Sequence, residues 1–522
     1  MELVRENILL NRHIGRERSQ MLLEGDIIVP DVKPDIASVL KVTARVAINK
    51  ANANMGRISF SGQLVVDALY LANVGGEISV HSISARNNID DFLNMEGVAP
   101  HMWLNLDANL ENIEHHIVND RKLNYRVVVD IQAQALDNQN FEAVRSISDL
   151  PESQQKMAFL TMNNMVSKQV EQFTIRDEIV LPSAKPAIRE LLQANINIVS
   201  REITMAAGRV DISGDLLITP LYKGFDSESI IDFADFELPF SGSLDVEAAR
   251  EGVFSDVRLS LADHLIEIGP DADGEDRILS IEVVIAADVQ ISENREFSVL
   301  EDAYCIDQNL DIKTQSLDYL SLICRNRNQF SAKEIVTLSG APEILQVLQV
   351  GGLVHLEDRR VIEDKVIVEG IVEANILYVA NSDEAPVHNY RAHLPFRQVI
   401  ETKGARLGME AAITHNIDQI SFNMLSGREV ELRFTLSFDT LIRELRPAQL
   451  IQDIEFNPLN TEDLDNLPSM VILVAQQADS LWSVAKRYNA DLEELAAIND
   501  IEPTAALAAG QKLLVVKKVA EG

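Results

Sequence analysis

The sequence contains few cysteines and no long apolar run. Its 522 residues include only Cys305 and Cys324, so two thiols are available and neither a disulfide framework nor a four-thiolate zinc site is expected. No apolar stretch approaches the ~20 residues that a helix needs to cross a bilayer. The first residues are charged and lack the apolar segment of a signal peptide. These absences predict a cytoplasmic protein with reduced thiols and no direct membrane insertion.

Basic residues are also in the minority. The chain has 46 lysines and arginines against 81 aspartates and glutamates, so its formal net charge is −35 at pH 7. A field of this sign repels phosphate, which argues against nucleic acid and anionic lipid as partners. The acidity favours a partner that offers a basic surface.

The common motifs of catalysis are missing as well. The sequence has no phosphate-binding glycine loop, no His-Glu-x-x-His and no Gly-x-Ser-x-Gly. His115 and His116 are adjacent, so they cannot share one face of a strand or helix as metal ligands would. The acidic segment 271–276 lacks the later glutamate of a calcium loop and is interpreted as a hairpin turn. We therefore expect no enzyme activity, no cofactor and no metal.

The sequence does contain a long repeat. Pro34, Pro186 and Pro342 are spaced 152 and 156 residues apart, and apolar residues follow each proline at two, five and six positions. The spacing i, i+3, i+4, with proline at the first position, predicts a short helix that packs against a sheet. The repeated residues are Ile36, Val39 and Leu40, then Ile188, Leu191 and Leu192, then Ile344, Val347 and Leu348.

Each predicted helix is followed by a long predicted strand. A glycine stands 28 residues after each proline and a tyrosine eight residues after each glycine, in stretches where apolar residues alternate with period two. The glycine indicates a β-bulge or the close approach of another backbone, which we expect to be that of the helix. The glycine and tyrosine pairs are Gly62 and Tyr70, Gly214 and Tyr222, and Gly370 and Tyr378. Further along, Leu-Pro-Phe occurs at 238–240 and 394–396, with a weaker match at 91–93. Each copy ends with a predicted closing strand, which follows Arg121, Arg277 or Arg428.

These patterns predict a multidomain, mainly β (α+β) protein. Three tandem domains of antiparallel strands with short helices are expected, each about the size of a standard domain. Helices are expected at the repeated prolines and in the segments 157–172 and 310–323. The expected limits are 1–155, 156–309 and 310–458 for the three domains, 459–469 for a linker and 470–518 for a small terminal module.

The repeat resembles the SPOCS domain, which is named for spore-coat proteins of endospore-forming bacteria. The resemblance rests on the Pro-x-Ile segment, on the glycine and tyrosine eight residues apart, and on Leu-Pro-Phe. A lysine precedes the proline in the first two copies, whereas the third copy has Ala341. The features that the copies share are packing features, and serial copies of one domain favour a binding or assembly role through avidity.

The terminal module has the predicted order strand, helix, helix, strand. Asp479 is a suitable N-cap for the first helix, and Asp491 with Glu494 three residues later predicts the start of the second. The segments ADSLWSVAKRY, LEELAAIND and GQKL are similar to the LysM domain, in which the loops before the first helix and after the second form a shallow groove for N-acetylglucosamine chains. The resemblance places in this partner- or glycan-binding groove Asp479, Ser480, Leu481, Asn499, Asp500, Ile501, Glu502 and Pro503.

Three alanines depart from the LysM pattern. Ala478 replaces the usual glycine before the aspartate, and Ala508 and Ala509 stand where the family often has a bulky residue followed by proline. A shallower and less aromatic groove offers less stacking surface to a sugar ring. Trp482 is expected in the helical core first and on the groove wall second. We therefore expect a protein partner for this module.

The combination of the two domains is similar to the clostridial family of spore-coat morphogenetic proteins that interact with stage IV sporulation protein A, the basement-layer ATPase. The resemblance implies a non-enzymatic adaptor that binds this ATPase and other coat proteins and organises coat assembly around the forespore. The implied location is the mother-cell cytoplasm, at the forespore surface and in the spore coat. Two alternatives stay open: a LysM protein that binds peptidoglycan or chitin-type glycans, and a self-assembling filament or lattice protein.

Overall fold

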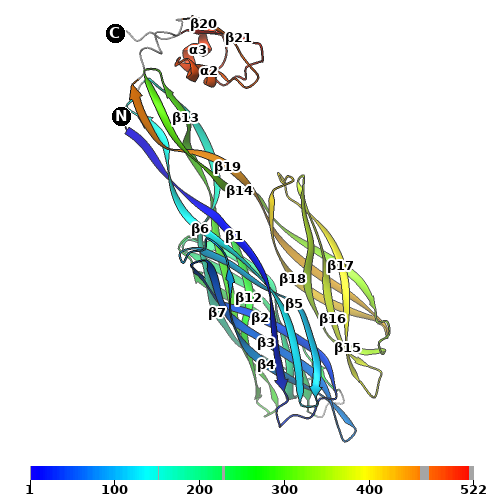
Figure 1. Cartoon of the computed structure of the whole chain (residues 1–522). Coiled ribbons are helices and arrows are strands. Elements are labelled where there is room, and N and C mark those ends of the chain that lie inside the picture. Colours follow the sequence, from blue (N-terminus) through cyan, green and yellow to red (C-terminus); the bar gives the residue numbers. More distant parts are fainter. Residues whose placement is uncertain (1, 151, 226–229, 459–469, 517–522) are drawn as a thin grey trace.

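The computed structural model of the chain describes residues 2–150, 152–225, 230–458 and 470–516. Up to residue 458 the described part is built from antiparallel strands, and its two helices lie in the terminal module. Figure 1 shows the long strands in three groups and the small helical module at one end of the molecule. The prediction of a mainly β, multidomain protein is confirmed.

The first repeat folds into a sandwich of two three-stranded sheets. Its strands are β1 (Glu2–Ile28), β2 (Ser38–Asn54), β3 (Arg57–Val74), β4 (Glu77–Asn94), β5 (Trp103–Asn119) and β6 (Lys122–Ser148). One sheet has the order β1-β6-β5 and the other has the order β2-β3-β4. Their facing sides bury Ile58, Val66, Tyr70, Val127 and Val129 in one core.

The other two repeats form the same sandwich. The second has β7 (Ser153–Val180), β8 (Ile188–Ala206), β9 (Arg209–Gly224), β10 (Asp232–Phe233), β11 (Phe236–Asp245), β12 (Phe254–Pro270) and β13 (Asp276–Cys305). The third has β14 (Gln308–Thr337), β15 (Ile344–Ile362), β16 (Lys365–Ala380), β17 (Val387–Glu401), β18 (Glu410–Ser426) and β19 (Glu429–Pro458). In the second repeat the sheets are β12-β13-β7 and β8-β9-β11, and β10 also pairs with β9. In the third repeat they are β14-β19-β18 and β15-β16-β17. The exact domain limits given above stay a prediction.

The helices predicted at the repeated prolines are wrong, because each proline stands outside regular structure and the residues after it enter a strand. Pro34 follows a tight turn in which the Lys33 N–H donates to the Pro30 carbonyl oxygen over 2.9 Å, and β2 begins at Ser38. In all three repeats a β-bulge interrupts the strand at the same place. A bulge inserts one residue and re-aims its side chain, so apolar residues of a strand come to lie three and four apart, as on a helix. The inserted residues are Leu40, Leu192 and Leu348.

The helices predicted at 157–172 and 310–323 are also wrong, because these segments belong to β7 and β14. Each strand passes from one hydrophobic core into another. Met162 and Leu317 lie in a cluster shared by the three repeats, whereas Val166 and Ile323 pack against the cores of their own sandwiches. Val166 and Ile323 are inserted at bulges. The buried face therefore changes along each strand, and period two is lost.

The repeated glycine marks a close approach of another backbone, as predicted, but the neighbour is a strand. A Cβ atom at each glycine would lie far inside van der Waals contact with a carbonyl oxygen of the adjacent strand, opposite a second bulge. The pairs are Gly62 with Ala47 O at 2.3 Å, Gly214 with Ser200 O at 2.2 Å, and Gly370 with His355 O at 2.3 Å. Only glycine leaves room for this bulge.

The Leu-Pro-Phe segments lie on the other side of these glycines. Phe240 pairs with Gly214, and Phe396 pairs with Gly370. In the first repeat, the residue opposite Gly62 is Ile89. The weaker match at 91–93 is therefore wrong, because the register places the equivalent segment a few residues earlier.

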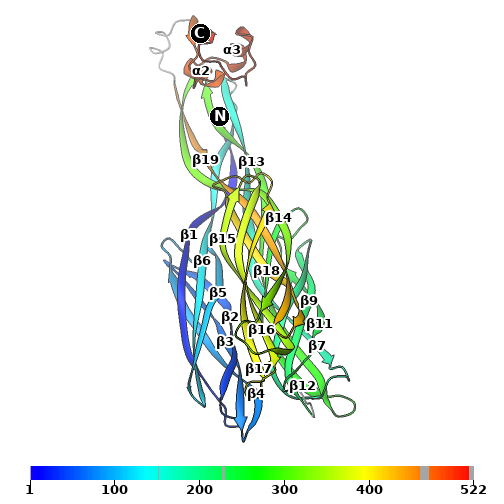
Figure 2. The same ribbon diagram turned by 90° about the vertical axis from the view of Figure 1, so that its right-hand side faces the viewer.

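The three sandwiches stand side by side (Figures 1 and 2), and we call the line along which all three meet the pseudo-threefold axis. The bulged leucines meet there with three further leucines that each lie 35 residues after a repeated proline, and all six belong to one cluster. The further leucines are Leu69, Leu221 and Leu377. Beyond the sandwiches, the antiparallel strand pairs β1/β6, β7/β13 and β14/β19 continue together and share a core that contains Ile8, Phe297 and Leu450. We call this shared continuation the stalk.

Polar contacts between the sandwiches follow the same cyclic order. Arg16 in β1 pairs with Glu410 in β18 over 3.3 Å, and Lys168 in β7 donates to Asn105 in β5. Arg16 and Lys168 occupy equivalent positions in their sandwiches. Each is the cross-strand partner of the residue that stands 13 places after the repeated arginine before the closing strand. In these two contacts the β1 or β7 edge of one sandwich meets the β18 or β5 edge of another, which is a head-to-tail arrangement of the kind that closes into a ring.

The terminal module has the predicted strand-helix-helix-strand order. Its elements are β20 (Met470–Val474), α2 (Leu481–Arg487), α3 (Leu492–Ile498) and β21 (Lys512–Val516). The N-cap of α2 is Ser480 and not the predicted Asp479, since the Ser480 side chain accepts from the Ser483 N–H. Asp491 caps α3 as predicted. The predicted linker 459–469 and residues 517–518 lie outside the described residues.

Candidate functional site

The terminal module is docked on the end of the stalk through Asp302 of β13. The indole Nε1–H of Trp482 donates to one carboxylate oxygen of Asp302 over 2.8 Å, and the ammonium group of Lys486 contacts the other oxygen at 2.5 Å. Trp482 and Lys486 lie four residues apart on α2, so both project from one face of this helix. In Figure 1 the helices lie on the stalk side of the module and β20 and β21 on the far side.

Tyr304, also in β13, completes the core of the terminal module. Its side chain is 4% exposed and belongs to the module's hydrophobic cluster. The phenolic O–H donates to the Ala490 carbonyl oxygen over 2.8 Å, and the ring meets the half-buried Trp482 edge-on with centroids 5.1 Å apart. Burial raises the pKa of Tyr304 well above its usual value. The module and the stalk therefore share one packed interface.

The two loops of the predicted groove lie together. An isolated β-bridge joins Ser480, before α2, to Ala506, after α3. Ser480, Asp500, Glu502 and Pro503 are exposed. The structure thus brings half of the predicted groove residues to one accessible surface beside the module's helix ends.

The other predicted groove residues hold the loops in place. Leu481 is 1% exposed, in the core. The Asn499 amide donates to the carbonyl oxygens of Leu495 and Leu514, each over 2.8 Å, and accepts from the Leu514 N–H over 2.7 Å. Ile501 packs against the hydrophobic cluster. These side chains hold the two loops in place and offer little surface to a partner.

Asp479 has a similar structural role. Its carboxylate accepts from the Gln476 N–H over 2.9 Å and pairs with Arg487 at 3.0 Å. The hydrogen bond from the Gln476 backbone, with the nearby guanidinium, lowers the pKa of Asp479 below its usual value. Among the predicted groove residues, the accessible acidic groups are therefore Asp500 and Glu502, and Ser480 is exposed as well. Carboxylates in this position suit a basic protein surface or the hydroxyl groups of a glycan.

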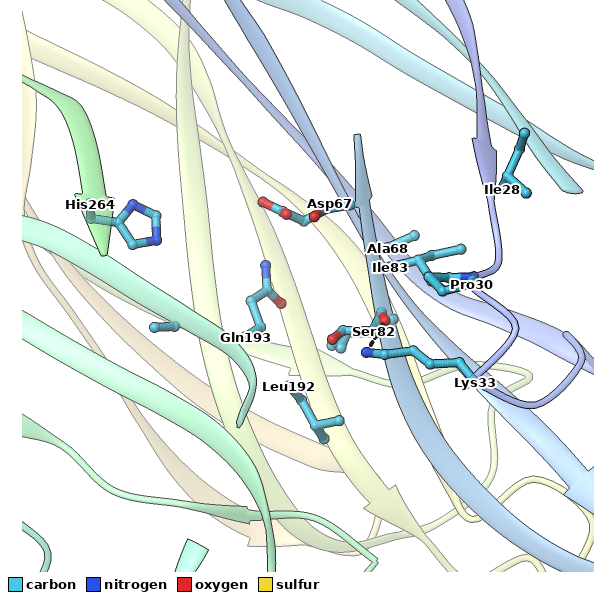
Figure 3. Close-up of a pocket in the computed structure, with 13 residues that line it drawn as sticks. Ile28, Pro30, Lys33, Asp67, Ala68, Ser82, Ile83, Leu192, Gln193 and His264 are labelled. Carbon is cyan, nitrogen blue, oxygen red and sulfur yellow. Dashed lines mark hydrogen bonds between the residues drawn. The ribbon is translucent and has the colours of Figure 1, made fainter. Parts of the chain in front are cut away.

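A cavity of about 310 Å³ opens between the first and second sandwiches (Figure 3). Lys33, Asp67, Ser82, Gln193 and His264 supply most of its polar lining. Lys33 is engaged in the wall, since its ammonium group donates to the Ser82 carbonyl oxygen over 2.7 Å. Burial, with Arg45 nearby, lowers the pKa of His264 to about 4. Burial raises the pKa of Asp67.

A second cavity of about 330 Å³ lies between the second and third sandwiches. Its lining includes Arg201, Asp256, Arg325 and Asp439, and Arg325 makes a two-pronged contact with Asp439 at 3.1 and 2.6 Å. Sequence reasoning missed both cavities because their residues come from different repeats. No local pattern in the sequence shows which side chains the ring brings together.

The described ranges contain neither a metal-binding cluster nor a membrane-spanning helix. No group of three or more histidine, cysteine, aspartate or glutamate side chains in these ranges is arranged to hold a metal ion. No helix of this part of the chain is long and apolar enough to cross a membrane.

Comparison with protein families agrees with the two resemblances. The family described as SipL, SPOCS domain, matches residues 35–118, 187–268 and 343–425. The LysM domain matches residues 474–516. No curated protein and no solved structure matches the chain. SPOCS and LysM domains are non-catalytic binding domains, and their combination fits a sporulation coat-associated protein.

Proposed function

Because the chain is a protein of three SPOCS domains and one C-terminal LysM domain, we propose that it is a non-enzymatic adaptor of spore-coat assembly. The LysM domain docks stage IV sporulation protein A, the basement-layer ATPase, at the forespore surface in the mother cell. The three SPOCS domains then recruit or organise other coat proteins. Domain composition carries the coat-associated role, and the structure supports a division of labour between the two ends of the molecule.

The observation that supports this division is the docking of the LysM domain on the stalk. Its contacts with the stalk use Trp482, Lys486 and Ala490, whereas Ser480 and Glu502 in the groove stay exposed. The groove is thus available while the domain is held. A partner bound there would be connected to the SPOCS ring through a packed interface that includes Tyr304.

The test uses the full chain and a charge reversal in the groove. Glu502→Arg is expected to abolish capture of the purified ATPase, because an unpaired arginine at an interface costs far more than one on a free surface. Glu493→Arg is the matched control, since Glu493 is exposed on α3 outside the predicted groove. Ile501→Arg is unsuitable, because Ile501 packs against the core.

The result is clear in either direction. Loss of capture by Glu502→Arg alone, with both variants unfolding at the wild-type temperature, supports the groove as the docking site. Full capture by both variants moves the interface away from the groove. Failure of the wild-type chain to capture the ATPase at all contradicts the proposed partner.

A second candidate function is glycan binding, which the LysM family match favours. The groove keeps the exposed Ser480 hydroxyl and the Asp500 and Glu502 carboxylates, which can accept hydrogen bonds from sugar hydroxyls. The flanking Ala508 and Ala509 offer no aromatic surface for ring stacking. Sedimentation with purified peptidoglycan distinguishes the candidates: pelleting that Glu502→Arg abolishes, without capture of the ATPase, would establish the glycan function instead.

A further inference from the structure

The three SPOCS domains place three long polar side chains at one equivalent position beside the pseudo-threefold axis. Lys41, Gln193 and Gln349 each stand seven residues after the repeated proline. Each directly follows the inserted leucine of the first bulge. The position is thus occupied by lysine once and by glutamine twice, and we call these residues the junction triad.

The junction triad forms contacts between the domains. The Lys41 ammonium group donates to the Gln349 side-chain oxygen over 3.3 Å, which connects the first domain to the third. The Gln193 amide nitrogen donates to the Thr43 hydroxyl over 3.3 Å, which connects the second domain to the first. The neighbouring inserted leucines pack in the apolar cluster on the axis. The polar groups of the junction triad therefore lie next to the apolar leucine cluster.

The hydrogen-bonding capacity of the junction triad is only partly used. Gln349 is 4% exposed, and its Nε2 atom has no hydrogen-bond partner among the described residues. Lys41 forms no ion pair with any described carboxylate. Burial alone lowers the pKa of Lys41 to about 8, with no acidic group acting to raise it. The Lys41 side chain is half-buried, and an ammonium group withdrawn from water without a counter-charge is costly, as is a buried N–H without an acceptor.

Both deficits call for the same kind of group, an acceptor that carries negative charge. The oxygen and nitrogen of the Gln349 amide share one carbon atom, so Nε2 lies one amide width from the atom that Lys41 contacts. One small anion can therefore touch both donors. The Gln193 amide adds no donor, because its nitrogen already donates to the Thr43 hydroxyl.

A solvent-sized space adjoins the junction triad. Gln193 lines the cavity between the first two domains, and Figure 3 shows its side chain among the lining residues. Leu69 and Asp67, in the opposite wall, are the cross-strand partners of Lys41 and Thr43. The positive charges of Arg45 and Arg86 lie near the Asp67 carboxylate and act to lower its pKa. The cavity thus reaches the junction triad at Gln193.

We propose that the junction of the three SPOCS domains is a binding site for a small monovalent anion of the halide class, held by Lys41 Nζ and Gln349 Nε2. The anion neutralises the one lysine of the junction triad and links the first domain to the third. It thereby closes the ring at the position where the other two domains supply a neutral glutamine. This site is independent of the LysM groove and of the proposed partner.

The experiment measures chloride binding to the full chain by the broadening of the ³⁵Cl magnetic resonance line, with sodium gluconate keeping ionic strength constant. The wild-type chain is expected to broaden the line saturably and to unfold at a higher temperature in chloride or bromide than in gluconate. Lys41→Gln, which makes all three positions glutamine, is expected to weaken the binding at least tenfold. Lys50→Gln is the control, because Lys50 is exposed on the same strand.

Gln349→Glu provides a second, independent variant. A carboxylate at this position would pair with Lys41 inside the junction, so the chain is expected to fold and to lose its response to chloride. The proposal is overturned if the wild-type chain shows no saturable broadening. It is equally overturned if Lys41→Gln and Gln349→Glu respond to chloride as the wild type does, because the ion would then bind elsewhere.

Discussion

The phenolic O–H of Tyr70 donates a hydrogen bond to the carbonyl oxygen of Pro34 over 2.9 Å. Tyr378 makes the same bond to Pro342 over 3.2 Å. Tyr222, in the second domain, is equally buried but its hydroxyl has no hydrogen-bond partner among the described residues. In two of the three domains, the tyrosine therefore fastens the proline turn to the central strand of the sheet.

This difference predicts unequal effects of removing the hydroxyl. Tyr70→Phe is expected to lower the free energy of unfolding by about 0.5–1.5 kcal/mol, because it leaves the Pro34 carbonyl without its donor. Tyr222→Phe is expected to be neutral or stabilising, since it removes a hydroxyl that is buried without a partner. Urea unfolding of the two variants provides the measurement. Equal losses would show that the hydrogen bond to Pro34 contributes nothing.

The repeated glycine gives a second prediction. Gly62→Ala places a methyl group 2.3 Å from the Ala47 carbonyl oxygen, and this backbone contact cannot relax without moving the bulged strand. The expected loss is at least the ~1–3 kcal/mol of an overpacked core site. Gly351→Ala is the control, because a Cβ there meets nothing within 4 Å. Thermal unfolding should separate the variants, and an unchanged midpoint for Gly62→Ala would contradict the steric reading.

The strands could be predicted from the sequence where they alternate strictly, as from Gly370 to Tyr378, because period two is a local property of one strand. The helices were mispredicted where a bulge adds a residue, since Leu40 and its equivalents shift the pattern to a spacing of three and four. A bulge depends on the pairing partner, and the sequence of one strand does not show it. The same limit explains the weaker match at 91–93, which only the pairing of Gly62 with Ile89 corrects.

The candidate site could be predicted only in outline. The order of LysM segments predicts which loops form the groove, and in the structure Ser480 and Glu502 of these loops are exposed. The structural duties of Asn499 and Ile501 depend on contacts with β21 and the core, which no local pattern reveals. The junction triad was missed for the same reason. Lys41 and Gln349 are 308 residues apart, and only the closed ring brings them together.

Two histidines between the first and second domains predict a dependence of stability on pH. Burial lowers the pKa of both side chains to about 4. A nearby positive charge adds to this effect, from Lys223 at His81 and from Arg45 at His264. An unfolded histidine takes up its proton near pH 6.5. The unfolded chain thus binds more protons between these values, so stability is expected to be full above about pH 6.5 and to fall as the pH drops towards 4.

A variant tests the assignment to these residues. At His264 the charged neighbours are Arg45, Asp263 and Arg86, and the Arg45 guanidinium lies 3.4 Å from its Nδ1 atom. His264→Gln is expected to reduce the fall of the thermal midpoint between pH 6.5 and 4. His116→Gln, at an exposed side chain of β5, is expected to leave that fall unchanged. Identical profiles for the wild type and His264→Gln would rule out His264 as a source.

The last prediction concerns the interface between the LysM domain and the stalk. Asp302→Ala removes the acceptor of both Trp482 and Lys486, and Tyr304→Ala removes a ring from the LysM core itself. Asp302→Ala is expected to speed amide hydrogen exchange in α2, because this helix loses its anchor, while exchange in the sandwiches stays as it was. Tyr304→Ala is expected to cost the LysM domain about 3–5 kcal/mol, as for other buried aromatic residues replaced by alanine.

Glu301→Ala is the control for both variants, since Glu301 precedes Asp302 and pairs with Lys156 on the surface. A LysM fragment made without β13 lacks Tyr304, so it is expected to resemble Tyr304→Ala in hydrogen exchange and in thermal midpoint. Partner assays on such a fragment would then report on a weakened domain, and the full chain is the proper reagent. If the fragment matched the intact chain in both measurements, Tyr304 would be a passive contact and the LysM domain would fold without the stalk.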